Sequence, residues 1–312
     1  MKIHFDNVNF QAKTGPCTFA RRLATELFSA GHEVTTDYND AELSLVFIEP
    51  TGQKLSKTIV QRLDGIWTKP EEFVARNKPI RDLYDIASAV IWQSQFDHDM
   101  ITKWWGKRDG KIIRNGIDIK PVTTFSSPEL AQIRSGYKLV LTCSSNWHPQ
   151  KRLNANVNLF KHIRSTIEPS TCLIVMGNNP DVMVPDKNIF YTGSLPEHLY
   201  LEVFSMADWT LHLAYCDHAP NVIIESISQN TPVICSDVGG TKEIVGEFGM
   251  VLKEKLPFSF EPFDYDKPPY IDVTQLTKLP KKGMLGKSSE IDIKSITVQY
   301  IQLFEDLLRK NS

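Results

Sequence analysis

The chain has 312 residues, of which 41% are hydrophobic and 23% are charged, a composition typical of globular proteins. Its 35 basic and 37 acidic residues leave a net charge of −2, which argues against nucleic-acid binding, since such proteins usually carry a basic patch. At roughly 100–200 residues per domain, the length predicts two domains.

Strands and helices are expected to alternate over residues 1–119. Apolar runs predict strands, and apolar side chains spaced by four predict helices. Helices are expected to begin at Thr14–Pro16, after Pro79 and at Ser94. The expected strands are Lys2–Val8, Glu33–Thr36, Leu43–Ile48, Ile59–Leu63, Ala89–Gln93 and Lys111–Arg114.

Residues 120–136 interrupt this pattern with a cluster of prolines, threonines and serines. Such residues favour loops, so we interpret this stretch as a linker or hinge between domains.

Residues 137–290 return to the alternation and end in a different pattern. Prolines, aromatics and lysines crowd residues 254–290, where we expect an irregular excursion, and residues 291–312 predict a final amphipathic helix. The strands expected before the excursion, with helices between them, are Leu139–Cys143, Cys172–Met176, Ile189–Tyr191, Thr210–Leu213, Val233–Cys235 and Met250–Leu252.

The alternation in both halves defines the fold class. Repeated strand–helix units form parallel sheets with helices on both faces. The prediction is therefore an α/β protein of two doubly wound, Rossmann-like domains that face each other across a cleft, with domain 1 over residues 1–119 and domain 2 over residues 137–290.

The compartment is predicted from the N-terminus and the cysteines. The first residues, MKIHFDN, lack the apolar segment of a signal peptide, and no run approaches the roughly 20 apolar residues of a membrane helix. The five cysteines include no CxxC pair, which favours reduced core thiols. We expect a cytoplasmic protein without a transmembrane segment.

Functional residues are sought just after the strands, because doubly wound folds bind ligands beyond the carboxyl ends of their strands. Gly15 follows the first strand at a helix start, where it either lets a phosphate approach the backbone or forms a simple turn. No GxGxxG motif is present, which argues against a nicotinamide dinucleotide enzyme.

Lys151 and Arg152 follow the first strand of domain 2 at a predicted helix start. Positive charge is unfavourable at a helix N-terminus, so two cations there favour an anionic ligand, for example a diphosphate leaving group. A solvated basic pair at a helix start is the structural alternative.

Asp217 and Glu225 lie eight residues apart, across a loop and the first turns of a helix that begins near Pro220. The backbone of Asn221 and Val222 lies at that helix start, where a phosphate binds well. Acids enriched near a helix N-terminus are the structural alternative.

Three segments together resemble the retaining glycosyltransferases of glycosyltransferase family 4, which have the GT-B fold. Residues 221–243 read NVIIESISQNTPVICSDVGGTKE, residues 112–118 read IIRNGID, and residues 191–200 read YTGSLPEHLY. As a combination these segments are specific, whereas each alone is not. The glycine pair in the first segment and the Asn115-Gly116 step in the second also fit ordinary turns.

The resemblance implies that domain 1 faces the acceptor and that domain 2 binds a nucleotide sugar. It assigns donor diphosphate binding to Lys151 and to the backbone of Asn221 and Val222, donor ribose binding to Glu225, and the transferred sugar to Asp217. Gly193 and Leu195 match the segment that flanks the base. The family further implies retention of anomeric configuration, with no metal and no cofactor.

Some positions depart from the family pattern. Asn146 stands where the family has an arginine, five residues before Lys151. Arg152 is a candidate for the missing charge. Asp217 replaces a glutamate, and only Gly15, followed by Pro16, remains of an N-terminal glycine pair.

Two DxD patterns occur, Asp97–Asp99 and Asp264–Asp266. The first lies in a helix first turn, where acids are favoured anyway, and the second lies in the excursion. We interpret both as structural or surface residues and predict no metal site.

Asp64 and Gly65 end a predicted strand of domain 1 and are the acceptor-side candidates, although they also fit a core-and-turn role. The acceptor itself, whether a glycan, a lipid-linked sugar or another molecule, is left open, as is peripheral membrane contact. The rival functions are a sugar-nucleotide epimerase on the same fold and a two-domain sugar-binding protein.

Overall fold

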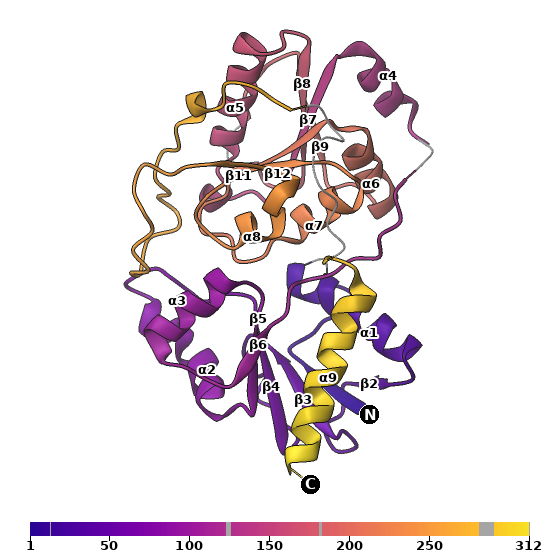
Figure 1. Ribbon diagram of the computed structural model, residues 1–312, viewed down its shortest axis with the longest axis vertical. Coiled ribbons are helices and arrows are strands. Elements are labelled where there is room, and N and C mark those ends of the chain that lie inside the picture. The colour runs from indigo at the N-terminus through magenta and orange to yellow at the C-terminus, as the bar shows by residue number, and fades with distance from the viewer. Residues whose placement is uncertain (13, 123–125, 181–182, 281–289, 312) are drawn as a thin grey trace. The chain divides into compact units, whose positions relative to one another are not determined.

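The computed structural model describes residues 1–312 except residues 13, 123–125, 181–182, 281–289 and 312. The chain forms two compact units. Unit 1 comprises Met1–Asp118, Phe260–Phe263 and Glu290–Ser312, and unit 2 comprises Ile119–Ser259 and Asp264–Ser289. Both ends of the chain therefore belong to unit 1 (Figure 1).

Unit 1 contains a six-stranded parallel sheet with the order β2-β1-β3-β4-β5-β6. Its strands are β1 (Lys2–Asp6), β2 (Glu33–Thr35), β3 (Leu43–Phe47), β4 (Thr58–Leu63), β5 (Ala89–Trp92) and β6 (Gly110–Ile112). Its helices are α1 (Gly15–Ser29), α2 (Phe73–Ile86), α3 (Gln95–Trp105) and α9 (Ile293–Asn311).

Different helices cover the two faces of this sheet. Apolar side chains of α1 and α9 pack against one face, and those of α2 and α3 pack against the other. In β5, Ile91 joins the first cluster and Trp92 the second, because successive side chains of a strand point to opposite faces. The final helix, α9, thus completes the core of unit 1, beside α1 (Figure 1).

Unit 2 contains a second six-stranded parallel sheet, with the order β12-β11-β10-β7-β8-β9. Its strands are β7 (Leu139–Ser144), β8 (Thr171–Met176), β9 (Ile189–Gly193), β10 (Trp209–His212), β11 (Val233–Ser236) and β12 (Gly249–Leu252). Its α-helices are α4 (Pro128–Gly136), α5 (Leu153–Thr166), α6 (Glu197–Met206), α7 (Asn221–Ser228) and α8 (Thr241–Val245), and its short 3-10 helices are η1 (Pro149–Lys151), η2 (Gly246–Phe248) and η3 (Val273–Gln275).

The faces of this second sheet are also covered on both sides. Helices α4 and α6 pack on one face, and α5 packs on the other. Ile271, Val273 and Leu276 of the predicted excursion join the α5 side, so this part of the excursion belongs to the core of unit 2. The two doubly wound α/β sheets predicted from the sequence are confirmed.

Two helices differ from expectation. Helix α2 begins before Pro79, which lies inside it, so Pro79 costs the helix one backbone hydrogen bond without ending it. Helix α4 occupies the second part of the predicted linker, with Ser127 accepting from the N–H of Leu130 and Pro128 at the first turn. Both are favoured helix-start residues, a signal that the surrounding serines and threonines obscured.

Two stretches with sequence expectations lie outside the described residues. They are residues 123–125 of the predicted linker and residues 281–289 of the predicted excursion.

Candidate functional site

The loops after β7 and β10 meet at the point where the strand order of unit 2 reverses. In the sheet, β7 lies between β8 and β10. The chain first adds β8 and β9 on one side of β7 and later adds β10, β11 and β12 on the other side. Doubly wound sheets bind ligands at this switch point, beyond the carboxyl ends of the strands. The candidate site of unit 2 therefore lies between these two loops.

Lys151 and Asp217 form an ion pair at this point. The ammonium of Lys151 donates to Oδ2 of Asp217 at 2.5 Å. Their side chains are only 20% and 13% exposed, so the pair is shielded without being closed to a ligand. Two residues that the sequence assigned to one donor site are thus in contact across 66 positions of the chain.

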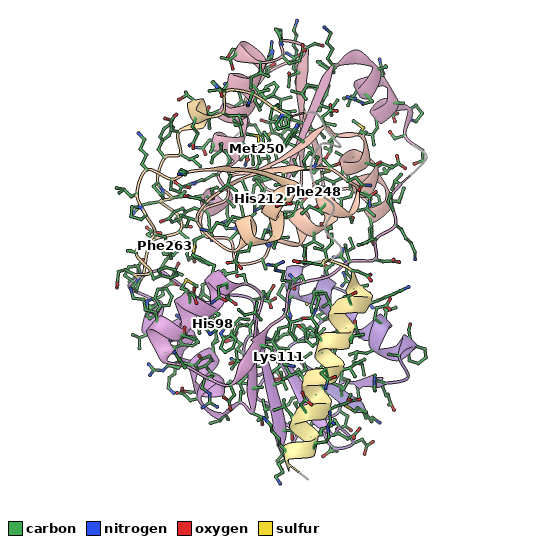
Figure 2. All side chains as sticks on the ribbon, viewed as in Figure 1. His98, Lys111, His212, Phe248, Met250 and Phe263 are labelled. Atoms are coloured by element: carbon green, nitrogen blue, oxygen red, sulfur yellow. The ribbon has the colours of Figure 1, made fainter. Side chains whose placement is uncertain are left out.

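A third side chain, His212 at the end of β10, joins this cluster. Figure 2 labels it among the side chains of unit 2. Its Nε2 lies 3.1 Å from the same Oδ2 of Asp217. Burial alone would raise the pKa of Asp217, but the charge of Lys151 and the hydrogen bond from His212 hold that pKa well below its usual range. Asp217 is therefore ionised at neutral pH.

The glycine pair after β11 supports the backbone of Asp217. The N–H of Gly240 donates to the carbonyl of Asp217 at 2.8 Å. Gly239 has φ +114°, and a Cβ there would lie 2.5 Å from the same carbonyl oxygen. Only glycine tolerates both this backbone conformation and this approach. The turn after β11, which also fits an ordinary glycine turn in the sequence, therefore holds the backbone of Asp217 in place.

The loop after β7 holds the same segment from the other side. Gln150 accepts a hydrogen bond from the N–H of Tyr215 at 2.9 Å and donates through Nε2 to the carbonyl of Cys216 at 3.2 Å. Lys151 is the next residue, so its position relative to Asp217 is set by backbone contacts as well as by charge.

Helix α7 carries the second acid of the predicted pair. Asn221 is its first residue, and Val222 packs with Leu195 against the apolar cluster of α6. Glu225, one turn later, is buried, and its Oε2 accepts from the hydroxyl of Tyr200 at 2.9 Å. Tyr200 was not singled out from the sequence, because its link to Glu225 depends on the packing of α6 against α7.

The other donor-side candidates lie in unit 2 around the ends of β7 and β9. Gly193 ends β9 with φ +66°. Asn146 is exposed in the loop after β7, with its Oδ1 3.5 Å from Nδ2 of Asn179. Their predicted contacts with a donor stay predictions.

Arg152 has a different environment from its neighbour Lys151. It is 2% exposed, and its guanidinium donates to Glu254 at 2.5 Å and to the carbonyl of Pro269 at 2.6 Å. These partners belong to the segment that follows β12. The arrangement favours a structural role, in which Arg152 ties this segment to the start of α5, over the donor contact suggested by its charge.

Unit 1 contains the acceptor-side candidates, of which Asp64 takes part in a buried polar cluster. Asp64 follows β4 and accepts from Arg62 and from Nε2 of Gln93, and Gly65 comes next with φ +127°. Gly15 is the first residue of α1. The predicted acceptor and donor contacts of these residues stay predictions.

The DxD residues have no metal-like grouping. Asp97 is buried, and Ser94 caps its helix by accepting from the N–H of Asp97. Asp264 instead pairs with Lys267. Within the described ranges, no group of three or more histidine, cysteine, aspartate or glutamate side chains is arranged to hold a metal ion. None of the helices described is both long and apolar enough to cross a bilayer.

Residues 131–257 match the family Glycosyl transferases group 1. The matched segment is less than half of the chain. It includes the Lys151–Asp217–His212 cluster, helix α7 and the glycine pair.

A curated relative matches over a shorter stretch. The putative teichuronic acid biosynthesis glycosyltransferase TuaC of Bacillus subtilis (strain 168) is 29% identical over 88 residues. The match covers 28% of this chain and 23% of that protein, so the chain spans about a quarter of the length of the curated relative it matches.

Solved structures match over nearly the whole chain. HepE from Anabaena, in complex with UDP-glucose, has a TM-score of 0.65 at 14% identity and covers 98% of this chain, which covers 100% of HepE. Sucrose-phosphate synthase from Thermosynechococcus elongatus has a TM-score of 0.70 at 15% identity, with 99% and 100% coverage. WaaG, a glycosyltransferase involved in lipopolysaccharide biosynthesis, has a TM-score of 0.60 at 13% identity, with 99% and 94% coverage. The predicted GT-B fold is confirmed.

Proposed function

We propose that this protein is a glycosyltransferase that moves a sugar from a nucleoside-diphosphate sugar to an acceptor. The observation that carries the proposal is the cluster of Lys151, Asp217 and His212 at the switch point of unit 2, inside the segment that matches the group 1 family. A cytoplasmic location and an acceptor that is a glycan, a lipid-linked sugar or another hydroxyl compound belong to the same proposal.

In the proposed reaction, the bond between the anomeric carbon and the diphosphate breaks, and its electron pair leaves with the diphosphate. An acceptor hydroxyl oxygen bonds to the anomeric carbon and loses its proton, so donor and acceptor become nucleoside diphosphate and glycoside. Lys151 and the N-terminus of α7 stabilise the charge that develops on the diphosphate. Asp217 faces the transferred sugar, and Glu225 holds the ribose.

The donor is identified by measuring thermal stabilisation with a panel of nucleotides and nucleotide sugars. A donor at about 100 times its Kd should stabilise the protein by about 2.7 kcal/mol. UDP-sugars come first in the panel, because HepE was solved with UDP-glucose. If no nucleotide or nucleotide sugar changed the melting temperature, the result would contradict the proposal that the protein binds a nucleotide-sugar donor.

Activity should not depend on a divalent metal, because the ammonium of Lys151 and a helix N-terminus supply the charge opposite the diphosphate. Excess chelator in the assay should therefore leave the rate nearly unchanged. Complete loss of activity that manganese or magnesium restores would contradict this.

The product should keep the anomeric configuration of the donor, as the resemblance to family 4 implies. Proton NMR of the first-formed product reads the configuration directly. Inversion would reject the retaining mechanism while leaving the transferase activity in place.

Neutralising Asp217 and neutralising Glu225 should change the kinetics of the enzyme in different ways. A ribose contact is made about equally in ground and transition states, so Glu225→Gln should raise donor KM and leave kcat largely intact. A contact to the reacting sugar tightens as positive charge grows at the anomeric carbon, so Asp217→Asn should mainly lower kcat. Steady-state kinetics with varied donor separates the two effects.

Melting curves of both variants provide the control. If the acids merely favour the helix N-terminus, each variant loses about 0.3–1 kcal/mol of stability and turns over normally. Exchanged kinetic phenotypes would instead mean that the two acids have the opposite assignments.

A further inference from the structure

His212 is a buried polar side chain that the proposed reaction does not yet use. It is 5% exposed, and it is the last residue of β10, beside β11 in the sheet. Figure 2 labels it in unit 2. A buried imidazole is stabilised by hydrogen bonding, and the partner of its Nε2 is the carboxylate of Asp217 at 3.1 Å.

The two carboxylate oxygens of Asp217 have different surroundings. His212 and Lys151 approach the same atom, Oδ2. Among the residues that the structure describes, no partner is recorded for Oδ1, and the side chain is 13% exposed. Oδ2 is thus the held oxygen, and Oδ1 is the oxygen able to accept from a ligand.

The two donors to Oδ2 differ in how firmly they are placed. Lys151 reaches Asp217 with a flexible side chain that carries three N–H donors, and under the proposed function it also meets the donor diphosphate. The imidazole of His212 has two side-chain torsions and extends from a central strand of the sheet. When a diphosphate draws the ammonium of Lys151 away, His212 still holds the carboxylate.

We propose that His212 is a positioning residue, which keeps Asp217 turned so that Oδ1 meets a hydroxyl of the transferred sugar throughout donor binding and transfer. This inference rests on the proposed function of the same site. His212 acts only through Asp217 and touches neither the donor nor the acceptor.

This role fixes the tautomer of the neutral imidazole. An ionised carboxylate can only accept, so Nε2 of His212 must carry the proton and Nδ1 must not. Nitrogen NMR of the protein labelled at histidine should therefore detect an Nε2-protonated ring for His212 in the absence of any donor.

The kinetic test compares His212→Leu, which has no donor, with His212→Gln, which offers a side-chain N–H. A hydrogen bond to a charged group is worth enough that His212→Leu should lower kcat by about 10–100-fold, with donor KM changed little. The glutamine variant should recover much of the rate.

Two comparisons exclude a merely structural effect. His4→Leu removes another buried histidine, whose Nδ1 bonds Ser44 in unit 1 at 3.0 Å, and it should leave kcat unchanged. Because His212 acts through Asp217, adding His212→Leu to Asp217→Asn should cost no further activity.

The results that would overturn this inference differ from those that would overturn the proposed function on which it rests. An unchanged kcat in His212→Leu, equal losses in the leucine and glutamine variants, an additive loss in the double variant, or an Nδ1-protonated ring would each reject the positioning role. If the wild-type protein itself turned over no nucleotide sugar, the proposed function would fail, and this outcome is visible without any variant.

Discussion

Replacing Lys151 by alanine should lower kcat/KM for the nucleotide sugar by a factor on the order of 10²–10³. In the proposed reaction the ammonium neutralises a diphosphate that gains charge as the sugar leaves, and a shielded site makes this interaction stronger than in water. The variant also removes the ion pair with Asp217, so the effect includes a carboxylate that has lost one of its two donors. Steady-state kinetics with the donor varied measures the loss.

The fold should survive this substitution, because the Lys151 side chain is partly exposed and contributes little packing. Lys161→Ala, an exposed lysine on the neighbouring helix α5, is the matched control and should retain full activity. Wild-type turnover by Lys151→Ala would return Lys151 to the status of an ordinary surface lysine.

Replacing Arg62 by methionine should destabilise unit 1 by about 3–5 kcal/mol, the usual effect of removing one partner from a buried charged pair. The guanidinium is fully buried and lies 4.2 Å over the ring of Phe19. It donates to Asp64, to Asn115, and through Nε to the hydroxyl of Tyr300 at 3.1 Å. Methionine fills much of the volume but leaves these oxygen atoms without their donor.

Denaturant unfolding measures this change, with unit 1 followed separately if the two units unfold at different midpoints. Arg81→Met is the control. Arg81 is exposed, and its Nε lies 3.9 Å from Oδ2 of Asp85. Such surface ion pairs contribute about 0–1 kcal/mol to stability. Equal effects of the two substitutions would contradict the role assigned to the Arg62 cluster.

Much of the architecture was predictable because periodicity reports local structure. The run Leu139–Cys143 predicted β7 to within one residue, and the helix start predicted at Lys151 and Arg152 lies directly before α5. Parallel pairing then follows from the alternation itself. The segments around Lys151 and Asp217 were also identifiable, since both lie just after strands of such a sheet.

The pairings across long sequence separations were not predictable. Arg152 carried the same signal as Lys151, and its ion pair with Glu254, 102 positions away, became apparent only in the folded chain. His212 lay within a run that reads as a buried strand, where its neighbours Leu211 and Leu213 gave no hint of a polar partner. Tyr300 joins Arg62 only because α9 packs in unit 1.

The central claim, transfer from a nucleotide sugar, is tested most directly by measuring nucleoside diphosphate release from the donor identified by thermal stabilisation, with and without a mixture of candidate acceptors. We predict release that increases with acceptor, in step with glycoside formation, and that falls sharply in Lys151→Ala. Conversion of the donor to an isomeric nucleotide sugar without acceptor would instead identify an epimerase. Donor that binds and is recovered unchanged under every condition would identify a binding protein and contradict the account.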